Sequence, residues 1–497
     1  MIRRRATSCR SLSKHRAEST SWLVSISWLV GILEIQTHVH GSAWSRIDRT
    51  AGHFVAHLDL RLKLFSASLS PPFRAVAQLN PPTKWPFMLS PDTETSLAPA
   101  SAARATRLPA FKVALIDPSL FTLPYDMKLA AGLREIGHRV TFYGKALGPE
   151  EAAPAGAKLV QHFYPEMQSW GLHRWPGGVS KAVKGALHLR SMRRLLDVLR
   201  AEQPDVIHFQ WLPLPIIDRS FIGALRTIAP LVLTAHDSRP FNASPSSVIQ
   251  KLGATSALGR FDRVVVHTEQ ARRRLVDYGV GPDRIVRIAH GFLHDDEPEA
   301  IAVPAPADGQ RVSFLLFGKI KPYKGADIAI EALRRMAPDT RERCVLRIVG
   351  KPYIDTKPLF RAATELGPSL VLDFRHVPDR EIPVLWKQAD VLLFPYREIE
   401  MSGVLMSALT AARPVIASEI GGFRELLENG RTALLVPPDD PDALSAAMSR
   451  LVGEPSVRRE MSQQIRALAA TIPTWRAIAR ETAAVYAQAR EARTAQG

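Results

Sequence analysis

The chain has 497 residues, of which 46% are hydrophobic and 23% charged, so it has the composition of a globular protein and the length for two or three domains. Its two cysteines, Cys9 and Cys344, are far apart and have no histidine partner at metal-ligand spacing. This argues against a disulfide framework and a zinc site and favours a reducing, cytoplasmic setting. The formal net charge of +17 predicts an anionic partner, such as a phosphate-bearing substrate, an anionic membrane surface or nucleic acid.

Residues 1–109 differ from the rest of the chain. They hold 14 Lys and Arg against 6 Asp and Glu, so 14 − 6 = 8 of the 17 net charges lie there. An apolar run at 22–33 follows a basic start, but it is too short to span a bilayer, and patternless sequence rich in Ser, Pro and Ala comes after it. We predict that 1–109 is a disordered or spurious extension, with Met88 as an alternative start; a peripheral membrane anchor is the other interpretation.

From residue 111 onward, short β-branched apolar runs alternate with helical patterns, which is typical of βαβ units in a parallel sheet. In the first series, helices are predicted at 124–136 and 269–278. Strands are predicted at 112–117, 139–143, 205–209, 230–234, 263–267 and 284–288.

A Pro, Ala and Gly-rich stretch at 303–309 reads as a linker, and a second series follows it. Its helices are predicted at 326–336 and 441–451, and 460–496 is helical with a break at Pro473. Strands are predicted at 312–317, 345–349, 370–374, 391–394, 414–417 and 433–436. The fold class is therefore α/β, with two Rossmann-like, doubly wound parallel-sheet domains at 110–300 and 301–475.

The most informative segment, 317–325, reads FGKIKPYKG and connects a strand directly to a helix. Gly318 allows a ligand to approach the strand end, and Lys319, Lys321 and Lys324 place cations around it. This pattern suits a diphosphate. The alternative is a lysine-rich turn in solvent.

A second segment, 394–409, prepares the start of another helix. Ser402 is a plausible N-cap for a helix at 403–410, whose free amides, beginning at Gly403 and Val404, favour an anion. Glu398 and Glu400 precede this helix and could accept hydrogen bonds from sugar or ribose hydroxyls. An ordinary helix cap with solvated acids is the other interpretation.

These stretches resemble glycosyltransferase family 4, whose members are retaining enzymes with the GT-B fold. Gly318-Lys319 and Lys324-Gly325 stand where the family typically has Gly-Arg and Lys-Gly, and the sequences PVIA at 414–417, GG at 421–422 and Glu425 match as well. The resemblance implies two Rossmann-like domains facing a central cleft, with 476–497 crossing back onto the first domain. It also implies that Lys319 and Lys324 contact the donor diphosphate.

The family's pair of glutamates does not match. Alignment back from Pro414 places Ile399 at the first glutamate position and Ser407 at the second. The role of the first must then pass to Glu400 or Glu398. Ser407 can still hydrogen-bond a ribose hydroxyl, though without charge assistance.

The first half resembles the family more loosely. Thr234-Ala-His-Asp237 ends a strand and places His236 and Asp237 where the family has a histidine at the cleft, and His290 lies in a sequence like the family's Pro-His-Gly-Val turn. A neighbouring strand, 205–209, is followed by residues suited to an acceptor pocket. The acceptor and cleft candidates are His208, Gln210, Trp211, Asp237 and His290. His236 or His290 could instead be a structural residue whose hydrogen bonds are all made within the protein.

The resemblance implies a hexosyltransferase that moves a hexose from a UDP or GDP sugar to a saccharide or lipid-linked saccharide, in cell-surface polysaccharide or glycolipid synthesis. Lys319 and Lys324 would stabilise the leaving diphosphate, since no protein-bound metal or other cofactor is expected. His236 would orient the sugar, and Glu400 completes the catalytic set. The donor-binding set is Gly318, Lys319, Lys324, Glu398, Glu400, Ser402, Gly403, Val404 and Ser407.

Competing interpretations remain open. A sugar-nucleotide 2-epimerase shares the fold and donor type. A nicotinamide oxidoreductase is disfavoured because no GxGxxG follows the first strand of either domain. Nucleic-acid binding would suit the net positive charge, but no recognition motif accompanies the charge. We therefore expect no nucleic-acid partner. A basic helical pattern at 170–200 could rest on anionic lipid at the inner face of the membrane, or form a solvated face.

Overall fold

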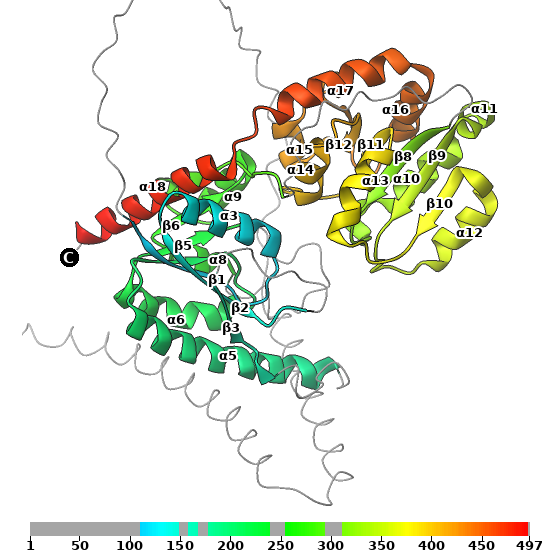
Figure 1. The fold of residues 1–497 in the computed structure, drawn as a ribbon. Helices are drawn as coiled ribbons and strands as arrows, with labels where there is room; N and C mark the ends of the chain where they lie inside the picture. The colour runs from blue at the N-terminus through cyan, green and yellow to red at the C-terminus, as the bar shows by residue number, and fades with distance from the viewer. Residues whose placement is uncertain (1–109, 149–157, 167–176, 239–253, 294–310, 496–497) are drawn as a thin grey trace, which may run out of the picture. The chain divides into compact units, whose positions relative to one another are not determined.

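The computed structural model describes residues 110–148, 158–166, 177–238, 254–293 and 311–495. They contain two all-parallel sheets, each flanked by helices (Figure 1). The expected α/β class with two Rossmann-like sheets is therefore confirmed. The predictions for 1–109, for the linker at 303–309 and for Trp170 and Trp175 lie outside the described residues, as does the domain boundary predicted at 300/301.

The first sheet has the strand order β3-β2-β1-β4-β5-β6-β7. Its strands are β1 (Lys112–Asp117), β2 (Arg139–Lys145), β3 (Lys158–Phe163), β4 (Val206–Phe209), β5 (Leu231–Thr234), β6 (Arg263–Val266) and β7 (Ile285–Arg287). The order steps from β1 outward to β3 on one side and to β4 on the other. This switch point is where doubly wound sheets bind ligands, at the carboxyl ends of the strands.

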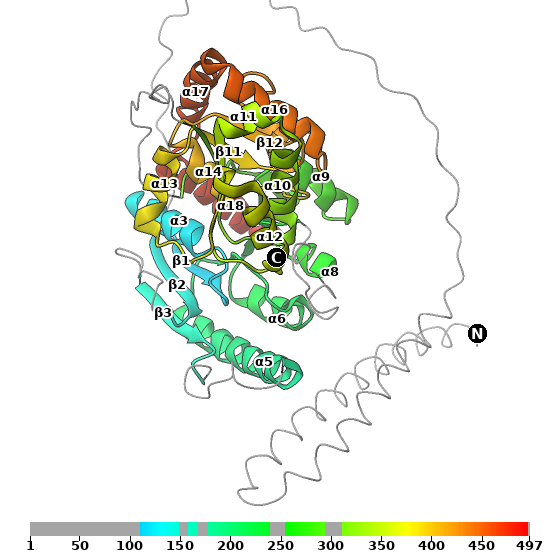
Figure 2. The same ribbon diagram turned by 90° about the vertical axis from the view of Figure 1, so that its right-hand side faces the viewer.

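Helices cover both faces of this sheet (Figures 1 and 2). One face is covered by α5 (Gly177–Glu202), α6 (Pro215–Ile228) and α8 (Ala254–Leu258). The other is covered by α3 (Leu123–Glu135) and by α18 (Trp475–Thr494), close to the end of the chain. Ile478 and Tyr486 of α18 are fully buried in this core. The two helices approach closely at Gly132, where an added Cβ would lie 2.6 Å from the Trp475 carbonyl oxygen.

Helix α5 carries the predicted basic face. Arg190 and Arg194 lie 3.4 and 3.5 Å from the Glu166 carboxylate, so part of its charge is paired within the protein. Contact between α5 and a membrane stays a prediction. Among the residues described, no helix combines the length and the apolar character needed to cross a bilayer.

The second sheet has the order β10-β9-β8-β11-β12-β13. Its strands are β8 (Val312–Phe317), β9 (Cys344–Val349), β10 (Leu370–Asp373), β11 (Val391–Phe394), β12 (Val415–Ser418) and β13 (Leu434–Val436). Its helices are α10 (Ala326–Arg335), α11 (Pro338–Glu342), α12 (Lys357–Leu366), α13 (Ile382–Gln388), α14 (Gly403–Leu409), α15 (Gly421–Leu426), α16 (Pro441–Gly453) and α17 (Pro455–Ala469). α9 (Glu269–Asp277), between β6 and β7, begins where Glu425 of α15 accepts hydrogen bonds from its first two amides, at 2.7 and 2.8 Å.

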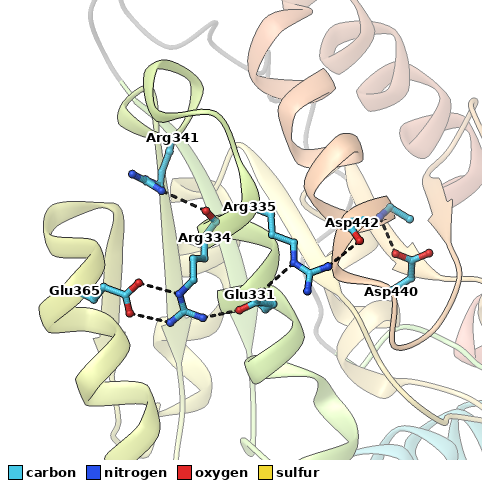
Figure 3. Close-up of polar contacts among 8 residues, drawn as sticks. Glu331, Arg334, Arg335, Arg341, Glu365, Asp440 and Asp442 are labelled. Carbon is cyan, nitrogen blue, oxygen red and sulfur yellow. Dashed lines mark hydrogen bonds and ion pairs between the residues drawn. The ribbon is translucent and has the colours of Figure 1, made fainter.

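Two arginines fix α10 between its neighbours (Figure 3). Arg334 makes a two-pronged ion pair with Glu365 of α12, at 2.9 and 3.0 Å, and Arg335 lies 2.7 Å from Asp442 of α16. Both arginines also contact Glu331 on α10 itself. Exposed pairs contribute little free energy singly, but here they form a network that joins three helices. α10 follows the lysine-rich corner directly, so the network helps to hold that corner in place.

Candidate functional site

The lysine-rich corner lies at the carboxyl end of β8. A 3₁₀ turn, Pro322–Lys324, leads through Gly325 into α10. The Lys324 ammonium donates to the Phe317 carbonyl oxygen at 3.1 Å and to the Tyr396 hydroxyl at 2.7 Å. Gly318 has φ +115°, and a Cβ on it would lie 2.9 Å from Lys324 Nζ. Glycine is favoured here by its positive φ, which other residues rarely adopt, and its lack of a side chain leaves room for the lysine beside the strand end.

Lys324 is a buried cation without an acidic partner. It is 3% exposed, and its contacts among the described residues are a carbonyl and a hydroxyl oxygen, with no carboxylate. Burial, with the nearby charges of Lys321 and Lys319, lowers the pKa of Lys324 to about 7. Lys319 itself is exposed. A buried charge is costly unless it is paired, so this arrangement favours an anion that approaches the ammonium.

The start of α14 adjoins the same corner. The Ser402 side chain accepts a hydrogen bond from the Leu405 amide at 3.1 Å, as a helix N-cap does. A Cβ on Gly318 would lie 3.6 Å from a methyl group of Val404, in the first turn of α14. Tyr396, which accepts from Lys324, also lies near the Ser402 side chain. The structure thus brings Gly318, Lys324, Ser402 and Val404 together.

Glycines fix the chain between β11 and α14 by close backbone contact. A Cβ on Gly325 would lie 2.0 Å from the Pro395 carbonyl oxygen. On the other side, a Cβ on Gly421 would lie 1.8 Å from the Ile399 carbonyl oxygen, and the Gly422 amide donates to the Glu400 carbonyl oxygen at 2.8 Å. The GG pair at 421–422 therefore packs its backbone directly against this loop.

Arg397 clamps the corner, and the sequence alone did not identify it. Its guanidinium makes two hydrogen bonds to Asp327 at 2.7 and 2.9 Å, one to Asp439 at 2.6 Å and one to the Pro322 carbonyl oxygen at 2.8 Å. Its backbone amide donates to the Tyr323 carbonyl oxygen at 2.8 Å. The only signal in the sequence was its position directly after Tyr396. Tyr396 itself was missed because its role depends on the fold.

Glu398, Glu400 and Ser407 are the three polar residues predicted to bind the donor beside α14, and their contacts differ from those of the lysine-rich corner. The Glu400 carboxylate is buried and accepts from Arg274 and from the Ser238 amide and hydroxyl, so in this conformation its hydrogen bonds go to protein groups. Ser407 is 3% exposed and donates to the Gly403 carbonyl oxygen of its own helix at 2.9 Å. Glu398 is exposed. Donor contacts from these residues stay predictions.

A second cluster lies at the carboxyl ends of the first sheet, where strands and loops bring four histidines together around Tyr125. The ring of Tyr125 lies 4.7, 5.2 and 5.2 Å from the rings of His236, His267 and His290. His208 joins through the Gln210 side chain, which lies 3.2 Å from His208 Nε2 and 3.0 Å from His236 Nε2. His208 is also tied to Tyr486 of α18 and to Thr234, each at 2.8 Å.

All four rings are neutral at physiological pH. Burial lowers the pKa of His208 to about 3, that of His267 to about 4 and that of His290, which is also near the His267 ring, to about 3. Burial and the three neighbouring histidines hold the pKa of His236 well below its usual 6.5. These histidines therefore act as hydrogen-bonding groups and not as cations.

The hydrogen bonds of His267 determine which nitrogen of His236 carries the proton. His267 Nδ1 lies 3.0 Å from the Ile288 carbonyl oxygen, which can only accept, so the proton of neutral His267 is on Nδ1. Its Nε2 must then accept from His236 Nδ1, 3.3 Å away. His236 Nε2 is left with a lone pair, and a half-turn of the Gln210 amide group presents its NH₂ to that nitrogen. His267 was not predicted as a site residue; its position at the end of a predicted strand was the available signal.

A hollow beside this cluster holds most of the predicted cleft residues. It is lined by Gln210, Trp211, Leu212, Pro215, Leu233, Thr234, Ala235, His236, Asp237 and Leu258. His208 is fully buried and His290 is 7% exposed, so they lie behind the lining. Burial and the negative charges of Asp237 and Glu398 raise the pKa of Tyr323, a residue of the lysine-rich corner, to about 12.

Two family models match the chain, one described as Glycosyltransferase Family 4 over residues 127–295 and one as Glycosyl transferases group 1 over residues 311–454. A D-inositol 3-phosphate glycosyltransferase from Kribbella flavida is 26% identical over 398 residues, which are 75% of this chain and 91% of that protein.

Solved structures agree on the fold. HepE from Anabaena, in complex with UDP, gives a TM-score of 0.59 at 17% identity and covers 76% of this chain and 100% of its own. Sucrose-phosphate synthase from Thermosynechococcus elongatus gives a TM-score of 0.59 at 18% identity, and the match covers 76% of this chain and 99% of that protein. The chain therefore belongs to glycosyltransferase family 4, and it is a glycosyltransferase with the GT-B fold.

Proposed function

We propose that the protein transfers a hexose from a nucleoside diphosphate sugar to a saccharide acceptor with retention of the anomeric configuration. The observation that carries this proposal is Lys324, a buried ammonium without an acidic partner that lies beside Gly318 and the first turn of α14. A diphosphate supplies the missing negative charge. HepE in complex with UDP and UDP-glucose has the same fold, which supports a nucleotide sugar as the donor.

In this proposal the bond between the anomeric carbon and the phosphate oxygen breaks, and negative charge develops on the diphosphate. Lys324 and Lys319 stabilise that charge more strongly than they stabilise the intact donor, which is the requirement for catalysis. The acceptor hydroxyl forms the new bond on the same face of the sugar, and its proton passes to the leaving phosphate oxygen. His236 is held at Nε2 by Gln210 and at Nδ1 by His267, and its ring lines the hollow and orients the sugar by direct contact.

The test is a screen of the purified protein for thermal stabilisation by UDP and GDP sugars, because a ligand that binds the native state raises its melting temperature. The stabilising donor is then incubated with saccharide and lipid-linked saccharide acceptors, and product anomers are assigned by NMR. A product with inverted configuration would contradict retention. An epimer formed without acceptor would favour the 2-epimerase interpretation, and stabilisation by no sugar nucleotide would contradict the donor site.

Diphosphate affinity should depend on pH through Lys324. The free ammonium has a pKa of about 7, and a bound diphosphate favours the charged form and raises that pKa. Above pH 7 binding must therefore take up a proton, and the Kd for UDP should rise about tenfold per pH unit between pH 7 and the pKa of the complex. Calorimetry in buffers of different ionisation enthalpy measures this uptake directly. A Kd that stays constant from pH 7 to 9 would contradict the assignment.

The acceptor could be linked to a lipid, since α5 presents basic side chains such as Arg193 on an exposed surface. We propose contact with anionic membrane at this face as an addition to the transferase function. A lipid-linked acceptor in anionic vesicles should then be used more efficiently than the same saccharide in solution. Equal use of both would contradict membrane contact and leave the transferase proposal intact.

A further inference from the structure

An exposed aromatic pair borders the hollow in the first sheet. Phe121 is 60% exposed, more than any other large hydrophobic side chain among the described residues. Its ring stacks on that of Trp211, with centroids 4.5 Å apart and an angle of 25° between the planes. Trp211 is only 9% exposed and follows β4, so it forms a rigid base beneath the exposed ring. Leaving a phenylalanine in water is unfavourable, and such exposure commonly marks a contact surface.

The loop between β1 and α3 is built to hold Phe121 outward. The buried Asp117 carboxylate accepts from the backbone amides of Ser119 and Thr122, each at 3.0 Å. Leu120 has φ +52°, a conformation that is costly for a residue other than glycine. In return its side chain is buried, 6% exposed, against Gly144. The loop therefore accepts backbone strain to bury Leu120 and leave its neighbour Phe121 in solvent.

Polar groups lie at the edge of the same surface. Trp211 shares the lining of the hollow with Gln210, His236 and Asp237. An amide, an imidazole ring and a carboxylate thus border one side of an aromatic platform. A pyranose ring has the complementary chemistry, because its C–H face is apolar and its hydroxyl edge donates and accepts hydrogen bonds.

We propose that the Phe121–Trp211 pair is the stacking platform for a sugar ring of the acceptor. This inference rests on the proposed transferase function and assigns its second substrate to a place. The diphosphate site lies at the strand ends of the second sheet, whereas this platform lies at the strand ends of the first sheet. Phe121 is therefore assigned to the acceptor and not to the diphosphate of the donor.

The test compares Phe121→Ala, Phe121→Leu and Phe121→Tyr in the full chain, with Phe360→Ala as the matched control. Phe360 is similarly exposed, at 52%, but it lies on α12, between β9 and β10 of the second sheet. The probes are the methyl glycosides of glucose, galactose and mannose and free myo-inositol, observed by saturation-transfer NMR. Phe121→Ala and Phe121→Leu should weaken binding of the preferred probe about tenfold, whereas Phe121→Tyr should retain it because it keeps the aromatic face.

In turnover assays the same loss should fall on the KM for the acceptor, with the KM for the donor unchanged. A loss in the donor KM alone would place the platform under the donor sugar and overturn the assignment. Binding of no probe to the wild-type protein, or equal binding to Phe121→Ala, would also overturn it. Thermal stabilisation by the donor is measured in parallel in the wild type and in Phe121→Ala. If the platform test is negative while the donor stabilises both proteins, only the platform assignment is wrong. If the donor does not stabilise the wild type, the proposed function itself is contradicted.

Discussion

Replacing Lys324 by methionine should lower kcat/KM for glycosyl transfer by about 100- to 1,000-fold, the usual effect of removing one group that stabilises transition-state charge. Methionine fills most of the space of the buried aliphatic chain but removes the ammonium. Steady-state kinetics at fixed acceptor concentration measure the loss. Lys357→Met, at an exposed lysine that begins α12, is the control and should retain wild-type activity.

The stability of the same variant distinguishes function from structure. The folded protein holds the Lys324 pKa near 7, below its ordinary 10.5, so folding disfavours the charged form. This cost is complete below about pH 7 and is lost as the pH rises toward 10.5, since the unfolded chain binds the proton that the folded chain releases. Lys324→Met should therefore have an equal or higher melting temperature, with the largest gain at neutral pH. Lower activity accompanied by lower stability would indicate a structural lysine.

Replacing His236 by alanine should reduce kcat about 100-fold while donor binding stays within a few-fold of wild type. The reason is that the His236 ring, which lines the hollow, holds the sugar in its reactive orientation, and loss of alignment has effects of about this size. Donor affinity is measured by calorimetry and kcat under saturating acceptor. His376→Ala, at an exposed histidine in the loop after β10, is the control. A donor affinity that fell in parallel with kcat would contradict the orienting role.

The hydrogen bond between His267 and His236 allows a second test of the role of His236. Substitution His267→Phe removes the group that accepts from His236 Nδ1 and should leave His236 as a mixture of two tautomers. Nitrogen-15 NMR of labelled histidines resolves the two forms. We expect a single Nδ1–H form of His236 in the wild type; a single Nε2–H form there would contradict the assignment.

Most strands were predictable because parallel sheets are buried on both sides and their strands are continuous apolar runs. β1, β8 and β11 match their predicted residues, and the other predicted strands shift by one or two residues at their ends. β3, the outermost strand, was missed. Only its last residue, Phe163, is buried, so its sequence lacks the apolar run on which the prediction relied.

The candidate site was predictable only where one short segment contains it. Gly318 and Lys324 lie seven positions or fewer from the end of β8, so the strand-to-turn-to-helix pattern was enough to place them. The partners of Lys324 and His236 were not accessible in this way. Tyr396 comes from the loop after β11, and His267 follows β6, so their contacts arise only when neighbouring strands align. The engagement of Glu400 by Arg274 likewise joins residues 126 positions apart.

The placement of α18 on the first sheet (Figure 1) has a consequence for how the protein is made. Val113 and Leu115 of β1 share their core with Ile478 and Tyr486, which leave the ribosome more than 350 residues later. In a ribosome-bound nascent chain that ends before α18, the face of the first sheet that α18 covers is therefore exposed to water. We expect separate expression of residues 110–310 to give an aggregating fragment, and addition of a synthetic 475–494 peptide to restore its solubility.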